Sequence, residues 1–118
     1  MVDRGELDEV LRAWCAGERD ERAVWAWAQA QKTAMQEAGE RPADELVRDI
    51  IDVLDALPFD VITTEDAAVM IDAMSNPPEE TDLSLNLLWN HLDAQDADAR
   101  RRELRDHPFY GEFYTEVY

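Results

Sequence analysis

The sequence predicts an all-α protein, a compact bundle of five to six short helices with an aromatic C-terminal tail packed on it. Apolar residues recur at helical spacing in successive segments, and caps, glycines or prolines bound each segment. Strand-like alternation occurs only weakly over residues 59–63, which is too short for a sheet. At 118 residues, 46% of them apolar and four of them tryptophan, the chain fits one helical domain over residues 1–118.

The first two helices are expected over about residues 6–16 and between Asp20 and Gly39. Gly17 lies where a C-terminal cap belongs, and Asp20 is a good N-cap for the second helix. That second segment contains no internal glycine or proline before Gly39, which favours one long helix.

The third helix has the clearest apolar stripe, running from Leu46 to Leu57. We expect Pro42 at its first turn and Pro58 at its end. Thr63, followed three residues later by Asp66, resembles a capping box and predicts the start of a fourth helix.

The fourth helix should stop at residues 76–78, because a tandem proline cannot continue it. A fifth helix, capped by Thr81 or Asp82, is expected to carry Leu83 to Leu92. A sixth, short helix should follow Asp96 and end near residue 106. The aromatic tail over residues 108–118 has no helical period, and its rings should share one docking face. The short connections predict antiparallel packing of successive helices.

The net charge of −17 is the strongest compositional signal and excludes two classes of partner. So acidic a chain repels nucleic acid and anionic membranes, and we expect it to bind neither. Residues 1–6 lack the pattern of a signal peptide, no segment is apolar enough to span a membrane, and Cys15 is the single cysteine. These features predict a cytoplasmic protein.

Acidic residues dominate the middle of the chain. Between residues 49 and 99 there are 13 Asp or Glu residues and no Lys or Arg. This stretch is interpreted either as a surface for a basic partner or as a means of solubility. The arginines at positions 100, 101, 102 and 105 allow a third interpretation, in which they dock on the acidic flank and tether the last helix.

Patterns typical of catalysis are missing from the sequence. Cys15, His91 and His107 are the only Cys and His residues, and they lack the spacing of a metal site. No phosphate-binding glycine loop or nucleophile motif is present, and Cys15 is expected to be a small core residue. We therefore expect no enzymatic activity, no metal and no cofactor.

Trp25 and Trp27 lie about 200° apart around one helix, so they cannot both face the same core. One of them must face the docked tail, a second layer or a partner. Both coverage by the tail and an open protein-binding or dimer surface remain compatible with the sequence.

Two stretches carry a resemblance to a group of known proteins. The first runs from Leu54-Asp55-Ala56-Leu57-Pro58 through Ile62-Thr63-Thr64-Glu65-Asp66 to Asn76-Pro77-Pro78, and the second is Arg100-Arg101-Arg102-Glu103-Leu104-Arg105-Asp106-His107-Pro108-Phe109-Tyr110. Together they resemble small uncharacterised acidic proteins of bacteria. The resemblance implies a bacterial cytosolic origin and an all-helical fold, and it brings no activity with it.

The leading hypothesis is an acidic helical protein-binding module, an adaptor or inhibitor of a basic protein. The alternative is a homo-oligomeric structural or interaction protein that pairs through exposed aromatics. The candidate partner-binding residues are Asp49, Asp52, Asp55, Asp60, Glu65, Asp66, Asp72, Trp25 and Trp27.

Overall fold

Seven α-helices and one 3-10 turn make up the part of the chain that the computed structural model describes, residues 2–114. These are α1 (Arg4–Cys15), α2 (Glu21–Ala38), α3 (Glu45–Asp55), α4 (Thr64–Met74), η1 (Pro78–Glu80), α5 (Thr81–Asp93), α6 (Ala97–Glu103) and α7 (Gly111–Tyr114). Residues 2–114 contain no strand, so the predicted all-α class is confirmed. None of the described helices is long and apolar enough to cross a membrane.

Aspartate caps determine where four of the helices begin. Asp3, Asp20, Asp44 and Asp96 each accept a hydrogen bond from a backbone N–H in the first turn that follows, at 2.8–3.0 Å. Such a cap satisfies one of the N–H groups that have no partner within the helix. The cap at Asp3 starts α1 two residues earlier than predicted.

The start and end of α3 differ from the prediction. Asp44 is the N-cap, so Pro42 precedes the helix and does not lie in its first turn. At the other end the helix stops at Asp55, and the chain turns through residues 56–62. Within this turn Val61 has a φ of 56°, a left-handed conformation that is strained for a β-branched residue.

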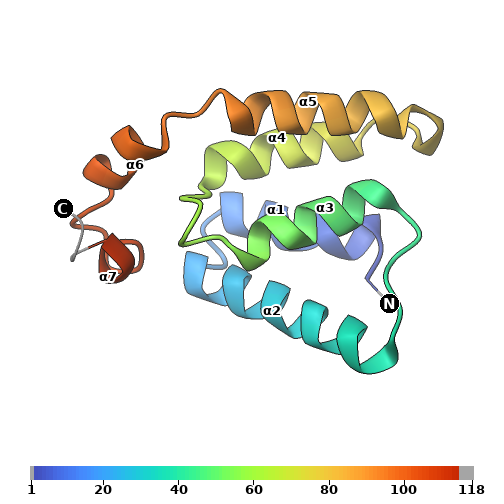
Figure 1. Cartoon of the computed structure of the whole chain (residues 1–118), viewed down its shortest axis with the longest axis horizontal. Coiled ribbons are helices and arrows are strands. Elements are labelled where there is room, and N and C mark those ends of the chain that lie inside the picture. The colour runs from blue at the N-terminus through green and yellow to red at the C-terminus, as the bar shows by residue number, and fades with distance from the viewer. Residues whose placement is uncertain (1, 115–118) are drawn as a thin grey trace.

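The first five helices alternate in direction and form the body of the protein (Figure 1). The main contacts join α1 to α4, α2 to α3, and α4 to α5, with smaller contacts between α1 and α2 and between α3 and α5. Successive helices run antiparallel, as predicted, but the closest partner of α1 is α4 rather than α2.

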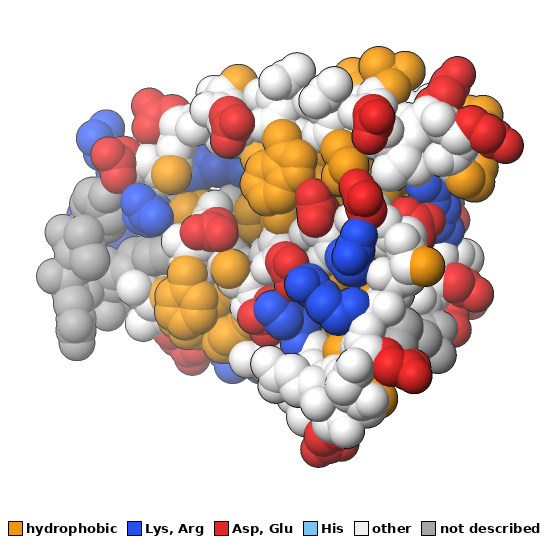
Figure 2. Space-filling view, turned by 45° about the vertical axis from the view of Figure 1, so that its right-hand side comes forward, with side chains coloured by type: hydrophobic (Ala, Val, Ile, Leu, Met, Phe, Trp, Pro, Cys, Tyr) orange, Lys and Arg blue, Asp and Glu red, His pale blue; other side chains and the backbone are white. Residues whose placement is uncertain are grey.

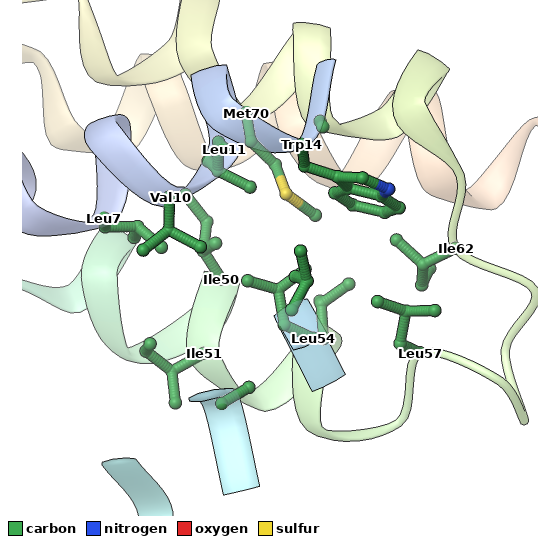
Figure 3. Packing of buried hydrophobic residues seen from close by; sticks show 14 of the residues in the cluster. Leu7, Val10, Leu11, Trp14, Ile50, Ile51, Leu54, Leu57, Ile62 and Met70 are labelled. Atoms are coloured by element: carbon green, nitrogen blue, oxygen red, sulfur yellow. The ribbon is translucent and has the colours of Figure 1, made fainter. Parts of the chain in front are cut away.

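The core lies where α1, α3 and α4 meet. Leu11 and Trp14 of α1, Ile50 and Leu54 of α3, and Met70 of α4 point toward one another (Figure 3). All five side chains are buried, and they belong to a larger cluster of buried apolar residues whose removal from water is the main driving force for folding.

The C-terminal segment forms an arm at one end of the body (Figure 1). α6 ends at Glu103, earlier than predicted, and the tail expected to lack regular structure contains the short helix α7. The predicted docking of the tail holds for Phe109 and Phe113, whose rings pack edge-on or tilted against Trp25 and each other. Residues 115–118 of that tail lie outside the described residues.

Candidate functional site: a pocket beside Trp89

A pocket of about 340 Å³ opens where α3, α5, the α3–α4 turn and the start of α6 meet. We call it the Trp89 pocket. Its apolar wall combines Trp89 with aliphatic side chains, and three aspartates and two arginines complete the lining. The lining residues are Asp52, Val53, Asp60, Ile62, Trp89, Leu92, Asp93, Gln95, Ala97, Arg100 and Arg101.

Trp89 forms one wall of the pocket on the side of α5 that borders α3, while α5 packs mainly on α4. Ser84 and Leu88 are the buried residues of α5, and Trp89 lies on the side of the helix toward α3. The side chain is 40% exposed, and its indole N–H donates to Asp49 Oδ2 at 2.9 Å. This bond joins α5 to α3, and the ring remains partly exposed to solvent.

Two carboxylates at the pocket, Asp60 and Asp93, are exposed. Within residues 2–114 neither of them forms an ion pair. The third aspartate of the lining, Asp52, differs, because Lys32 Nζ lies 3.0 Å and Arg41 Nη2 lies 2.9 Å from its carboxylate oxygens. The uncompensated charge of the pocket therefore comes from Asp60 and Asp93.

Arg100 lines the pocket, but its guanidinium is directed toward α4. It contacts Asp66 at 2.6 Å and 3.2 Å, and it also donates to Gln95 Oε1 at 2.9 Å and to the Val61 carbonyl at 3.2 Å. Burial alone would lower the pKa of Arg100, but the hydrogen bonds and charge of Asp66, with a smaller effect from Glu65, outweigh it and raise that pKa. The arginine is thus a permanently charged part of the wall.

Asp66 is the only charged residue in the interior of the described chain. Its carboxylate receives the guanidinium of Arg100, the backbone N–H of Thr63 at 2.8 Å, and His91 Nε2 at 2.8 Å. A buried charge is tolerated when it is paired and hydrogen-bonded in this way. We predicted Asp66 as part of a partner-binding surface, and its complete burial makes that assignment wrong.

Basic residues that are distant in sequence neutralise some of the carboxylates expected to form the acidic surface. Lys32 lies 3.9 Å from Asp55 as well as 3.0 Å from Asp52, and Arg100 Nη2 lies 3.3 Å from Glu65. The predicted docking of the arginine cluster is thus found for Arg100. One face of the molecule shows this mixture, with large exposed hydrophobic side chains among acidic ones and a group of Lys and Arg side chains bordering other acids (Figure 2).

The α3–α4 turn brings Asp60 and Ile62 to the pocket. Arg101 donates to the carbonyl of Phe59 at 3.1 Å, and Arg100 donates to that of Val61. The left-handed conformation of Val61 costs on the order of 1–3 kcal/mol and persists only where surrounding contacts enforce it. The two arginines of α6 therefore hold the turn in the shape that forms the pocket.

The two tryptophans singled out in the sequence lie away from the Trp89 pocket. Trp25 is half-buried, packs against Phe59, Phe109 and Phe113, and donates its indole N–H to the Asp55 carbonyl at 2.7 Å. Trp27 is half-buried against the core. The aromatic tail therefore covers Trp25, one of the alternatives that the sequence left open.

Asp72 and Cys15 line a separate shallow surface pocket between α1 and α4. Cys15 is exposed, so its predicted place in the core is wrong; the buried face of α1 consists of Leu7, Val10, Leu11 and Trp14. Although the residue is exposed, partial desolvation by its neighbours raises the pKa of the Cys15 thiol, with Arg12 acting in the opposite direction. No group of His, Cys, Asp and Glu residues suited to a metal ion occurs within the described chain.

Sequence reasoning identified Asp49, Asp52 and Asp60 but missed Trp89 and Asp93. The last two are four residues apart on α5, so they share a face of that helix, and this spacing was the available signal. What the spacing does not show is that this face lies beside α3.

Comparisons of this chain with protein-family models, curated proteins and solved structures found no match. The arrangement of the Trp89 pocket and its charges is therefore the basis on which a function is argued.

Proposed function

We propose that this protein is an acidic helical binding module, an adaptor or inhibitor that engages a basic protein partner through the Trp89 pocket. One observation carries the proposal. An exposed tryptophan, hydrogen-bonded to Asp49, stands beside two carboxylates, Asp60 and Asp93, that form no ion pair within residues 2–114. Tryptophan is a frequent anchor of protein interfaces, and carboxylates without partners favour a cationic ligand.

The charge of the whole chain favours the same class of partner. A net charge of −17 accelerates the approach of a basic protein and repels acidic ones. We accordingly expect neither nucleic acid nor anionic membranes as partners, no catalysis, and a cytoplasmic location. Homo-oligomerisation through exposed aromatics is the weaker alternative, because Trp25 is covered by Phe59, Phe109 and Phe113.

The proposed surface is smaller than the one expected from the sequence. Asp66 is buried, while Asp52, Asp55 and Glu65 have cationic neighbours within the chain. Asp60 is the predicted residue that remains both exposed and at the pocket, and Asp93 joins it. Recognition is therefore assigned to the Trp89 pocket and to the two exposed carboxylates at its rim, Asp60 and Asp93, rather than to the whole acidic stretch.

The proposal is tested with a defined basic polypeptide, poly-L-arginine of about 20 residues, titrated calorimetrically into the purified protein. We expect a Kd that rises with salt, and a loss of affinity of at least about 10-fold on Trp89→Ala, since an interface anchor contributes about 1.4 kcal/mol or more. Asp60→Asn with Asp93→Asn should also weaken binding.

The matched control for charge is the pair Asp72→Asn and Asp82→Asn, which removes two exposed carboxylates from other parts of the surface. If this control weakens binding as much as the pocket pair does, the attraction is a general effect of net charge and the proposed site is wrong. No binding to the wild-type protein at low salt would reject the module itself.

A further inference from the structure

We infer that the Trp89 pocket takes a guanidinium group, the side chain of an arginine presented by the partner. The inference rests on the proposed function and names the group that the pocket recognises.

The apolar part of the pocket suits the stem of a long side chain. Val53, Ile62 and Leu92 stand with the Trp89 ring in the lining, and the first two are buried in the protein. Arginine covers apolar surface with its methylene groups while its charged head stays near solvent. A pocket of about 340 Å³ is at the small end of ligand sites and accommodates one such side chain.

The charged groups of the pocket that have no partner within residues 2–114 are carboxylates, and they favour a cationic ligand. Arg100 is engaged by Asp66, Glu65, Gln95 and the Val61 carbonyl, so its donors are directed away from an incoming ligand. Arg101 likewise donates to Asp98 and to the Phe59 carbonyl. An anion would meet the carboxylates of the rim, whereas a cation would find Asp60 and Asp93.

A guanidinium fits this site better than an ammonium does. It is planar, stacks on an aromatic face, forms paired hydrogen bonds with a carboxylate, and loses its weaker hydration more readily. The Trp89 ring is 40% exposed, and its indole N–H donates to Asp49 at 2.9 Å, so the ring stands in the lining with part of its surface open to a ligand. Lysine could use the carboxylates but would gain less from the ring.

The experiment is a titration of the ¹⁵N-labelled, full-length protein with small probes, followed by NMR at the indole N–H of Trp89. The Trp89→Phe variant identifies that signal among those of the four tryptophans. The probes are n-butylguanidinium, n-butylammonium, n-butanol and butyrate, which share a short alkyl chain and differ in the head group.

We expect a saturable shift with n-butylguanidinium, at a Kd of roughly millimolar order for so small a ligand. n-Butylammonium should bind at least about 3-fold more weakly. n-Butanol and butyrate should cause no saturable shift. Equal binding of the two cations, or saturation by n-butanol, would overturn the inference.

Two variants test the role of the rim. Asp60→Asn with Asp93→Asn should weaken n-butylguanidinium binding at least about 5-fold, because the carboxylate partners are removed. Asp72→Asn, which lies on α4 beside a different pocket, should leave it unchanged. Equal effects of both changes would also overturn the inference.

The two proposals can fail separately. If poly-L-arginine binds the wild-type protein and the rim variant equally, and n-butylguanidinium does not bind, the pocket inference is wrong and the module uses another surface. If n-butylguanidinium saturates the pocket and poly-L-arginine does not bind, the proposed function is wrong and the pocket serves a small cation.

Discussion

Two groups of carboxylates from the same acidic stretch end in opposite environments. Asp66 is buried at the first turn of α4 between Arg100, His91 and the backbone of Thr63. Asp60 and Asp93 are exposed at the Trp89 pocket, which the same arginine also lines. The first group contributes to stability and the second is available to a ligand.

The difference shows that an uncompensated run of acids in the sequence need not be uncompensated in the structure. Arg100 lies 34 residues after Asp66 along the chain and is brought to it by α6. Arg100 reaches Glu65 as well, but Asp66 alone of the two is buried, so a carboxylate of this stretch becomes structural where it is both paired and buried.

Asp66→Asn should lower the free energy of unfolding by about 3 kcal/mol, because it leaves the guanidinium of Arg100 without its buried counter-charge. Urea denaturation measures the change. Glu65→Gln is the control, since Glu65 also faces Arg100 but has an exposed side chain, and it should change stability by no more than about 0.5 kcal/mol. If Asp66→Asn lowered the free energy of unfolding by less than about 1 kcal/mol, Asp66 would not be a structural carboxylate distinct from Asp60 and Asp93.

Tyr110→Phe should cost about 1–2 kcal/mol. The buried hydroxyl of Tyr110 donates to the carbonyl of Ile62, which the substitution would leave without that donor. This bond ties the C-terminal arm to the turn next to Asp66. For the double variant Tyr110→Phe with Asp66→Asn, we expect a loss of stability smaller than the sum of the two single losses, because both changes loosen the docking of the C-terminal arm. Full additivity would indicate that the arm docks independently of the ion pair.

Asp44 should contribute a measurable part of the pH dependence of stability. Burial raises its pKa, but hydrogen bonding and charge from Arg4, with backbone bonds from Val47 and Leu46, outweigh it and lower the pKa below the ordinary value of 3.8. A lowered native pKa means that stabilisation is present above the unfolded value and is lost as the pH falls through the native value. Asp44→Asn should therefore flatten the decline of stability below about pH 4. Urea midpoints at pH 5, 4 and 3 measure this, and equal slopes for both proteins would contradict it.

Asp60→Asn and Asp93→Asn should have the smallest effect on stability, within about 0.5 kcal/mol in either direction, because both side chains are exposed and without an ion pair in residues 2–114. Thermal or urea unfolding provides the measurement. A loss comparable with that of Asp66→Asn would show that the rim is structural, and the distinction between the two groups would disappear.

Much of the fold could be predicted from local chemistry. Helix caps at Asp20, Thr63 and Asp96 and the glycine after α2 lie where their residue types indicate. Asp44 was missed as the cap of α3, because a proline two residues earlier offered a plausible start. The site was predicted in part: Asp52 and Asp60 line the pocket, and Asp49 holds its tryptophan.

The all-α class, the approximate extent of the helices, their antiparallel succession and the excess of negative charge could all be read from the amino-acid sequence. These depend on interactions within a few residues or on composition. The packing of α1 on α4, the contact of Arg100 with Asp66, and the position of Trp89 next to α3 and Asp60 arise instead from the folded arrangement of the helices. Those contacts join residues far apart in the chain, and they follow from the joint packing of several apolar faces, which no local spacing specifies.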